Sequence, residues 1–337
     1  MTPRSRQTGL SLVELMVSIT LGLMILSGVL VVFVNTSAAR NEVERTSRQI
    51  ENGRYASELL SEDIRLAGFY GELGVAALAA PGALPADPCS TNAADWNSWI
   101  PVYMQGYDEG AGLAATTCVL GNLKPNTDVL VIRRARTCVA GVAGCDTAAN
   151  GKPYVQVSLC GTEATTHVLG LQGTATFDKT QRNCTTVAGQ REYFVRIYFV
   201  STDNGAGQNV PTLKRLQLTG AGWETVPLVE GIEEFQLHYG LDTTGDGVPD
   251  QYVANPNNYP LAAPTPLANW MNVVTVQFHL LARNLETTPN YTDAKTYYLG
   301  KDAAGSDIRV TPGLGYRRHV YSSLVRVVNP AGRRDTP

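Results

Sequence analysis

The sequence is poor in histidine and carries no recognisable catalytic motif. No nucleophile motif accompanies its four histidines, His167, His238, His279 and His319. The G-x-S-x-G, H-E-x-x-H, P-loop and G-x-G-x-x-G patterns are all absent from the chain. We therefore expect a protein that is not an enzyme.

The sequence also lacks an excess of positive charge. It has 27 Lys and Arg residues against 30 Asp and Glu residues, which gives a net charge of −3. A dedicated nucleic-acid-binding protein needs clustered cations, so this function is disfavoured. Of the 337 residues, 44% are hydrophobic and only 17% are charged. This composition argues against a disordered chain, because disorder requires low hydrophobicity and high charge.

One long apolar run lies near the N-terminus. Residues 10–34 contain a single charged residue, Glu14. A helix needs about 20 apolar residues to cross a bilayer, so this run is long enough to span one. Arg4 and Arg6 precede the run, and positive flanks stay on the cytoplasmic side. We therefore predict a single membrane span whose N-terminus is cytoplasmic, followed by an exported body.

A secretory signal and a plain membrane anchor are the simpler interpretations of this run. In a secretory signal a small-residue cleavage site follows an apolar core of about 7–15 residues, whereas here Gly9 precedes the run. A carboxylate in hydrocarbon costs about 2.5–3.5 kcal/mol on insertion scales, so a plain anchor gains nothing from Glu14. Cleavage after Gly9 would expose an α-amine on Leu10. That amine, from a neighbouring subunit or from the same chain, would neutralise Glu14.

Residues 9–14, GLSLVE, resemble the type III signal of type IV pilins and of type II secretion pseudopilins. The resemblance implies that a prepilin peptidase removes the leader, residues 1–9, by cleavage between Gly9 and Leu10. It also implies N-methylation of Leu10 and pairing of Glu14 with a subunit N-terminal amine during assembly. The first mature residue of this family is most often Phe, and here it is Leu10.

The helical pattern continues beyond the apolar run as an amphipathic half, residues 35–68. Residues 35–67 contain no proline and one glycine, Gly53. Steps of three and four residues define one stripe, which consists of Val43, Thr46, Ile50, Gly53, Ser57, Leu60, Ile64 and Ala67. We assign the charged residues, Asp63 among them, to the opposite faces, with Glu44 and Arg48 as an i,i+4 pair. The pattern predicts one helix of about 55–58 residues that stops at Gly68.

Two runs near the end of this helix, residues 49–56 (QIENGRYA) and 59–71 (LLSEDIRLAGFYG), resemble the PilW group of type IV pilus minor pilins. The resemblance implies a structural subunit of the pilus. The bulky exported body, too large for a densely repeated subunit, suggests that this subunit primes pilus assembly and lies in the tip complex. The resemblance also implies an inner-membrane location before assembly and the fibre at the cell surface afterwards. The implied partners are other minor pilins, the major pilin, a tip adhesin, the inner-membrane assembly platform and the prepilin peptidase, and the group's roles suggest cell adhesion and twitching motility.

Alternating apolar residues predict strands in the exported body, residues 69–337. The predicted strands cover residues 128–133, 191–200, 213–219, 232–239, 272–282 and 318–328. Residues 72–125 are rich in Ala, Gly and Pro, and we interpret them as loops and short turns in which Trp96 and Trp99 are buried anchors. We therefore expect an α+β, pilin-like fold, in which the long helix packs on an antiparallel sheet with large loop insertions. Residues 228–233 and 316–318 also resemble PilW-group runs.

Six cysteines follow the apolar run, namely Cys89, Cys118, Cys138, Cys145, Cys160 and Cys184. An even number of cysteines in an oxidising compartment favours disulfides, and six cysteines allow 15 pairings. Cys138 and Cys145, which enclose a short glycine-containing loop, are the first candidate pair, and Cys160 with Cys184 is the second. A zinc site is disfavoured, because no C-x-x-C spacing exists.

Residues 241–252, LDTTGDGVPDQY, have the spacing of a calcium loop around a turn at Gly247. The candidate ligands at alternate positions are Asp242, Thr244, Asp246, the carbonyl of Val248 and Asp250. A solvated hairpin turn is the alternative, because Gly-Asp-Gly favours turns and Val253 occupies the position of the EF-hand glutamate. The resembling group often carries this D-T-x-G-D-G run. Since three clustered carboxylates repel one another without a metal, we predict Ca²⁺ as the one cofactor.

Three hypotheses for the function remain open. The first is the minor pilin described above. The second is a minor pseudopilin of the J-like kind in a type II secretion system. The third is a membrane-anchored periplasmic binding protein that never polymerises, and it predicts that Glu14 is dispensable.

Overall fold

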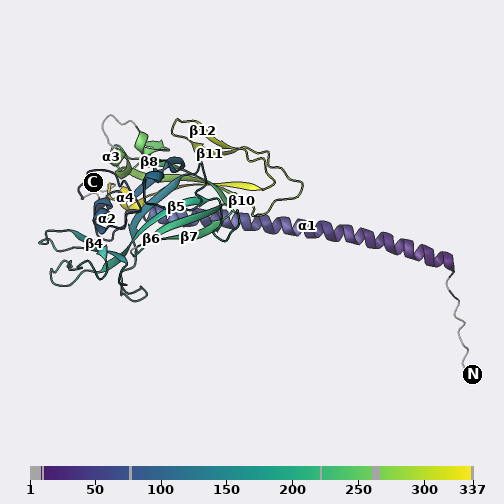
Figure 1. Cartoon of the computed structure of the whole chain (residues 1–337), viewed down its shortest axis with the longest axis horizontal. Helices are drawn as coiled ribbons and strands as arrows, with labels where there is room; N and C mark the ends of the chain where they lie inside the picture. The colour runs from purple at the N-terminus through teal and green to yellow at the C-terminus, as the bar shows by residue number, and fades with distance from the viewer. Residues whose placement is uncertain (1–8, 10, 76–77, 221, 260–265, 335–337) are drawn as a thin grey trace, which may run out of the picture. The chain divides into compact units, whose positions relative to one another are not determined.

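The computed structural model of the protein describes residues 9, 11–75, 78–220, 222–259 and 266–334. The chain divides into two compact units, Met1–Arg48 and Gln49–Pro337. One helix, α1 (Leu12–Arg65), runs from the first unit into the second and has 54 residues. The single long helix predicted from the sequence is therefore confirmed (Figure 1). Most of the predicted leader, residues 1–8, lies outside the described residues, as does Leu10.

The larger sheet of the second unit is antiparallel and, in the described residues, seven-stranded. Five strands follow the order β1-β2-β5-β3-β4, and β6 and β7 extend the sheet from β5. The strands are β1 (Met104–Tyr107), β2 (Val129–Ala135), β3 (Pro153–Val157), β4 (His167–Leu171), β5 (Gln190–Ser201), β6 (Thr212–Thr219) and β7 (Gly222–Glu230).

A second antiparallel sheet has the strand order β13-β10-β8-β9 in the described residues. A two-stranded ribbon of β11 and β12 belongs to neither sheet. These strands are β8 (Ile232–Leu241), β9 (Gln251–Val253), β10 (Val273–Arg283), β11 (Tyr297–Lys301), β12 (Asp307–Val310) and β13 (Arg318–Arg326). The short helices are α2 (Ala93–Trp99), α3 (Pro266–Met271) and α4 (Val328–Arg334), and 3₁₀ turns lie at Asp108–Gly110, Leu113–Ala115 and Pro256–Asn258.

The C-terminal part of α1 shares one hydrophobic core with both sheets. Leu60 and Ile64 are fully buried and cluster with side chains of β2, β5, β8 and β10. Ile132 of β2 points into this core, whereas its neighbour Val131 points into a second core on the other face of the same sheet, because side chains alternate along a strand. The fold is therefore α+β, with an antiparallel sheet packed on the long helix, as predicted.

The buried face of α1 is rotated relative to the predicted stripe. Gly53, Leu60 and Ile64 are buried as predicted. Ile50 and Val43, however, are 45% and 70% exposed, and the polar residues Gln49 and Asp63 are buried instead. The assignment of Asp63 to a solvated face was wrong, because sequence periodicity does not register polar side chains that find buried partners.

Residues 72–125 are more regular than the predicted loops. They contain α2, β1 and the 3₁₀ turns at Asp108–Gly110 and Leu113–Ala115. Trp96 and Trp99 of α2 are buried in the second core, as predicted for anchors. Asn92 caps α2, since its side chain accepts a hydrogen bond from the Ala94 N–H. A helix of seven residues is too short to show a repeated helical pattern of apolar residues in the sequence, although its cap residue is of a typical kind.

All six predicted strands are present, with ends that differ by a few residues. Several strands were missed, among them the nine-residue β7, whose residues Pro227 and Glu224 are unfavourable for a strand. Gly68 has a φ of +72°, which confirms the left-handed stop after α1.

Candidate functional site

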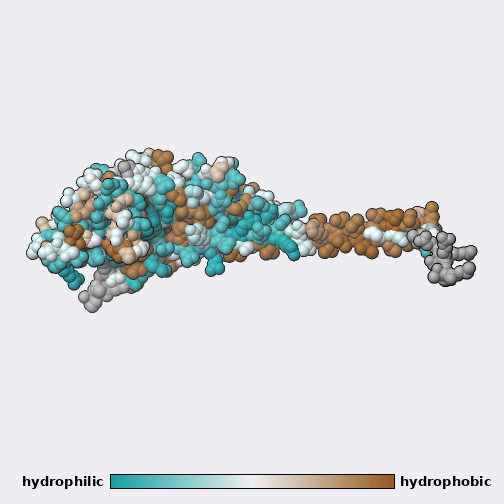
Figure 2. All heavy atoms as spheres, turned by 90° about the horizontal axis from the view of Figure 1, so that it is seen from below, coloured by the Kyte–Doolittle hydropathy of each residue, from teal (hydrophilic) through white to brown (hydrophobic). Residues whose placement is uncertain are grey.

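The first part of α1 carries exposed apolar side chains along its length. Figure 2 shows this segment as an almost continuous hydrophobic surface with a few paler patches. Leu12, Met24 and Phe33, for example, are 76%, 71% and 69% exposed. The segment is long and apolar enough to cross a membrane, and water is a poor environment for so much apolar surface. The segment therefore suits a membrane or the apolar interior of an assembly.

Glu14 and Ser11 form a capping box at the start of α1. The Ser11 N–H donates to the Glu14 carboxylate at 3.1 Å, and the Glu14 N–H donates to the Ser11 hydroxyl at 3.2 Å. The S-x-x-E sequence is the known signature of this arrangement, a local signal that the prediction of an amine partner for Glu14 did not include. The helix N-terminus also favours the negative charge. Glu14 thus has a local role in addition to the predicted intermolecular one.

The predicted cleavage falls directly before this capping box. Gly9 is described and exposed, and Leu10 lies outside the described residues. Glu14 is also exposed. In the sequence, Glu14 therefore lies four residues after Leu10, the residue whose nitrogen cleavage would convert into an amine.

Two side-chain amides, the buried Gln49 and the half-buried Asn52, attach the second unit's part of α1 to strand ends of both sheets. The Gln49 amide donates to the carbonyl of Ala282, at the end of β10, at 2.8 Å. The Asn52 amide donates to the carbonyl of Glu230, at the end of β7, at 3.1 Å. Gly53 lies against the ring of Tyr321, which leaves no room for a Cβ. Residues of the PilW-like run 49–56 therefore make specific packing and hydrogen-bond contacts in this fold.

Asp63 is the centre of a buried ion-pair cluster. Its carboxylate accepts hydrogen bonds from Arg134 at 2.7 Å, Arg196 at 2.8 Å and the Tyr198 hydroxyl at 2.5 Å. Burial alone would raise the pKa of Asp63, but the charges of Arg196 and Arg134 and the hydrogen bond from Tyr198 outweigh it, so the pKa is lowered. The cluster joins the end of α1 to β2 and β5.

The predicted calcium loop is organised by backbone hydrogen bonds to its carboxylates. Asp242 is buried and accepts from the N–H groups of Gly245 and Gly247 at 2.6 and 2.9 Å. Asp250 accepts from the N–H groups of Thr243 and Thr244 at 2.7 and 3.1 Å.

The other candidate ligands of the loop lie close to solvent. Asp246 accepts from the Val248 N–H at 2.8 Å, and Val248 is 56% exposed. Thr244 lies 3.5 Å from Asp242, measured from hydroxyl to carboxylate oxygen. This geometry is that of a carboxylate-stabilised turn, and calcium binding by the loop stays a prediction.

The six cysteines form three disulfides, Cys89–Cys118, Cys138–Cys145 and Cys160–Cys184. Both predicted pairs are therefore confirmed. The third pair follows by elimination once the other two are known, but it spans 29 residues and has no local signal of its own. The three disulfides brace the loops between residues 89 and 184.

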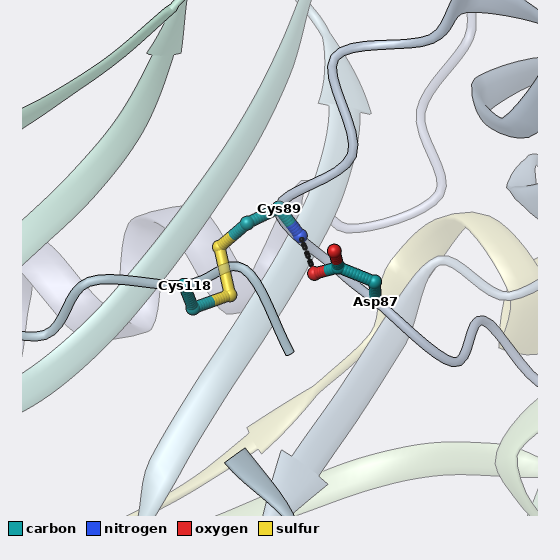
Figure 3. A group of neighbouring side chains, drawn as sticks. All are labelled: Asp87, Cys89 and Cys118. Carbon is teal, nitrogen blue, oxygen red and sulfur yellow. Dashed lines mark hydrogen bonds between the residues drawn. A yellow bond between two sulfur atoms is a disulfide. The ribbon is translucent and has the colours of Figure 1, made fainter. Parts of the chain in front are cut away.

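The disulfide Cys89–Cys118 lies beside the carboxylate of Asp87 (Figure 3). The ligand atoms of these three residues lie within 4.8 Å of one another. Both sulfur atoms are, however, consumed by the disulfide, and Asp87 accepts hydrogen bonds from the N–H groups of Cys89 and Thr117 at 3.0 and 3.1 Å. The cluster therefore fastens two loop segments together and does not suit a metal.

Two of the histidines lie in one cavity of about 460 Å³ in the second unit. The rings of His238 and His279 have centroids 5.7 Å apart. Burial lowers the pKa of both, that of His279 to about 4, so both imidazoles are neutral near neutral pH. His279 bonds to Ser322 at 2.7 Å, and His238 bonds to the backbone of Lys301. These contacts tie the histidines to neighbouring strands.

A long apolar N-terminal helix that continues into an antiparallel α+β body defines a type IV pilin-like protein. Residues 4–30 match the prokaryotic N-terminal methylation motif. Residues 197–329 match PilW, the type IV pilus-assembly protein W family. The chain therefore carries an N-terminal methylation motif and a PilW domain, which confirms the resemblance found in the sequence.

Comparison with solved structures finds a type IV-like pilin, TTHA1219 from Thermus thermophilus, at 16% identity. The match covers 62% of this chain and 81% of that chain, with a TM-score of 0.26. Comparison with curated proteins finds no match.

Proposed function

We propose that this protein is a structural subunit that primes assembly of a type IV pilus and lies in its tip complex. After cleavage between Gly9 and Leu10 and methylation of Leu10, the apolar helix enters the fibre from the inner membrane. Its partners there are other minor pilins, the major pilin and a tip adhesin. The exported body lies on the periplasmic side before assembly and at the cell surface afterwards.

The observation that supports this proposal best is the first turn of α1. A single carboxylate, Glu14, opens an apolar helix directly after a cleavage motif. In a medium without water, a carboxylate needs a positive partner or several hydrogen bonds. The Ser11 N–H supplies one hydrogen bond, and the amine of an adjacent subunit would supply the charge.

The first experiment measures the N-terminus of the mature protein by mass spectrometry. We expect a methylated Leu10 as the first residue, and Gly9→Val should leave the precursor uncut. A product that begins elsewhere, or that retains its leader in assembled fibres, would contradict the proposal.

The second experiment separates the two roles of Glu14. Gln at this position retains a side-chain oxygen for the capping box but has no charge. If charge pairing drives incorporation, Glu14→Gln should be lost from sheared fibres almost as completely as Glu14→Ala, while both precursors still reach the membrane. If Glu14 acts only as a cap, Glu14→Gln should enter fibres normally and Ser11→Ala should enter poorly.

A pseudopilin of a type II secretion system is the alternative, and the PilW match at residues 197–329 favours the pilus. Deletion of the gene should abolish pili and twitching and leave protein secretion unchanged. Loss of secretion with normal pili would favour the pseudopilin instead.

A further inference from the structure

Strand β13 forms one edge of the four-stranded sheet. Its nine residues pair with β10 in an uninterrupted register, from Arg318 opposite Arg283 to Arg326 opposite Thr275. In the described part of the chain, β13 has no strand on its other side. Leu324 is 58% exposed there. The edge is therefore long, regular and open to a further strand.

The register fixes which backbone groups point away from β10. The Val327 N–H donates to Val274, and the Asn284 N–H donates to Arg317. The N–H and C=O groups of the odd-numbered residues of β13 therefore point towards β10. In an antiparallel pair, the backbone groups of successive residues point alternately to the partner strand and to the opposite side. The N–H and C=O groups of Val320, Ser322 and Leu324 thus point to the open edge. In the described residues, none of these six groups has a hydrogen-bond partner among the contacts of the fold.

This edge lacks the features that protect the other sheet edges. Among the edge strands in the described residues, β1, β4 and β9 have four, five and three residues. Strand β7 is as long as β13, but it contains Pro227 at its middle and Glu224. The interior of β13, residues 320–325, contains no proline, glycine or charge. Soluble proteins normally block such edges, because an open one templates pairing with another chain.

We propose that the open edge of β13 is a docking site for an extended strand from a different subunit of the assembly. Only an extended polypeptide can satisfy a row of outward N–H and C=O groups at strand spacing. The exposed Leu324 calls for an apolar side chain on the incoming strand, on the same face of the sheet. The proposal rests on the proposed function, since it needs an assembly for the protein to enter.

A second copy of this chain is a poorer occupant than a different subunit. Antiparallel self-pairing centred on Ser322 would place Arg318 opposite Arg326 at both ends of the pair. Like charges directly opposite one another destabilise a sheet. This register is therefore unfavourable for a second copy, and we assign the strand that docks on β13 to another chain.

Hydrogen exchange of the full chain tests the proposal residue by residue. In detergent micelles, the amides of Tyr321 and Ser323 should exchange slowly, and those of Ser322 and Leu324 should exchange fast. In purified fibres or in the minor-pilin complex, Ser322 and Leu324 should slow at least 100-fold. Even-numbered amides that are already protected in micelles, or that stay fast in the assembly, would overturn the proposal.

Ser322→Pro blocks the edge without removing a bond to β10, because proline is tolerated on the outward side of an edge strand. Ser322→Val is its matched control, since it also loses the hydroxyl contact to His279 but keeps the outward N–H. We expect at least a tenfold loss of Ser322→Pro from sheared fibres and near-normal incorporation of Ser322→Val. Leu324→Lys, which keeps the whole backbone, should reproduce the loss if the proline variant folds poorly.

The outcomes separate this proposal from the proposed function. If the unaltered chain is absent from fibres, the proposed function fails. If the unaltered chain is present and both Ser322→Pro and Leu324→Lys enter normally, the strand-docking proposal fails alone. A concentration-dependent dimer of the pure chain that Ser322→Pro abolishes would overturn the choice of a different subunit as the occupant.

Discussion

Asp63 near the end of α1 and Arg134 in β2 form a buried ion pair with an N···O distance of 2.7 Å. The Asp63 side chain is 3% exposed and the Arg134 side chain is 9% exposed. Arg196 lies 2.8 Å from the same carboxylate oxygen. Two cations therefore depend on one carboxylate, which connects the helix to the middle of the larger sheet.

Replacement of Asp63 by Asn should strongly destabilise the second unit. Removal of the carboxylate leaves the buried Arg134 and the half-buried Arg196 without this counter-charge, and the loss of one partner of a buried pair costs about 3–5 kcal/mol. Urea unfolding of the full chain in detergent should show this loss for Asp63→Asn. The neighbouring exposed variant Glu62→Gln should change the free energy of unfolding by less than about 0.5 kcal/mol. Equal effects of the two substitutions would contradict the role of Asp63.

Asp128 should make the stability fall as the pH rises towards neutrality. Burial raises the pKa of Asp128 to about 7, despite the hydrogen bonds that its carboxylate accepts from Glu109 and Leu237. Between about pH 4 and pH 7 the folded chain therefore holds a proton that the unfolded chain has lost, so the stability falls as the pH rises. Each unit of pKa shift corresponds to about 1.36 kcal/mol, so the unfolding free energy falls by at most about 4 kcal/mol over this pH range.

The Asp128→Asn variant isolates this contribution from other titrating groups. His279 works in the opposite direction, because its lowered pKa makes the fold more stable as the pH rises from about 4 to 6.5. His279 contributes equally to both proteins, so its contribution cancels when the unfolding free energies of the wild type and Asp128→Asn are subtracted. We expect the unfolding free energy of the wild type minus that of Asp128→Asn to decrease from pH 4 to pH 7. A pH-independent difference would refute the raised pKa of Asp128.

The regular helices and strands of this fold could be predicted because the apolar residues within each of them follow a helical or a strand periodicity. Strands β5 and β10 alternate apolar residues over about ten positions, and α1 combines an apolar run with a stop at Gly68. Such local patterns are independent of distant residues. The two disulfides with the shorter separations, Cys138–Cys145 and Cys160–Cys184, were also predictable from spacing.

The remaining features depend on partners that are distant in the sequence. Asp63 is buried because Arg134 and Arg196, 71 and 133 residues away, supply its hydrogen bonds. Gln49 is buried because its amide reaches Ala282, 233 residues away. The capping box of Ser11 and Glu14 had a local signal and could have been predicted from the S-x-x-E spacing.

The disulfides should differ in their contribution to stability. Cys138–Cys145 closes a separation of 7 residues and Cys89–Cys118 one of 29. In the chain-entropy account, the longer loop gains about 1.3 kcal/mol more from closure. The double variant Cys89→Ser with Cys118→Ser should therefore lose more unfolding free energy than Cys138→Ser with Cys145→Ser. The reverse order, measured by urea unfolding, would show that lost packing outweighs loop entropy at these sites.

Calcium should bind the loop of residues 241–252 if its carboxylates converge on an ion. Asp242 and Asp250 already hold the turn through backbone hydrogen bonds, whereas Asp246 accepts a hydrogen bond from Val248, two residues along the same turn. Titration of the full chain in detergent with Ca²⁺ should show one site, which Asp246→Ala abolishes. Asp146→Ala, at an exposed carboxylate of another loop, is the control and should bind normally. If millimolar Ca²⁺ produces no binding and no increase in melting temperature, the loop is a carboxylate-stabilised turn and Asp246 has no ligand role.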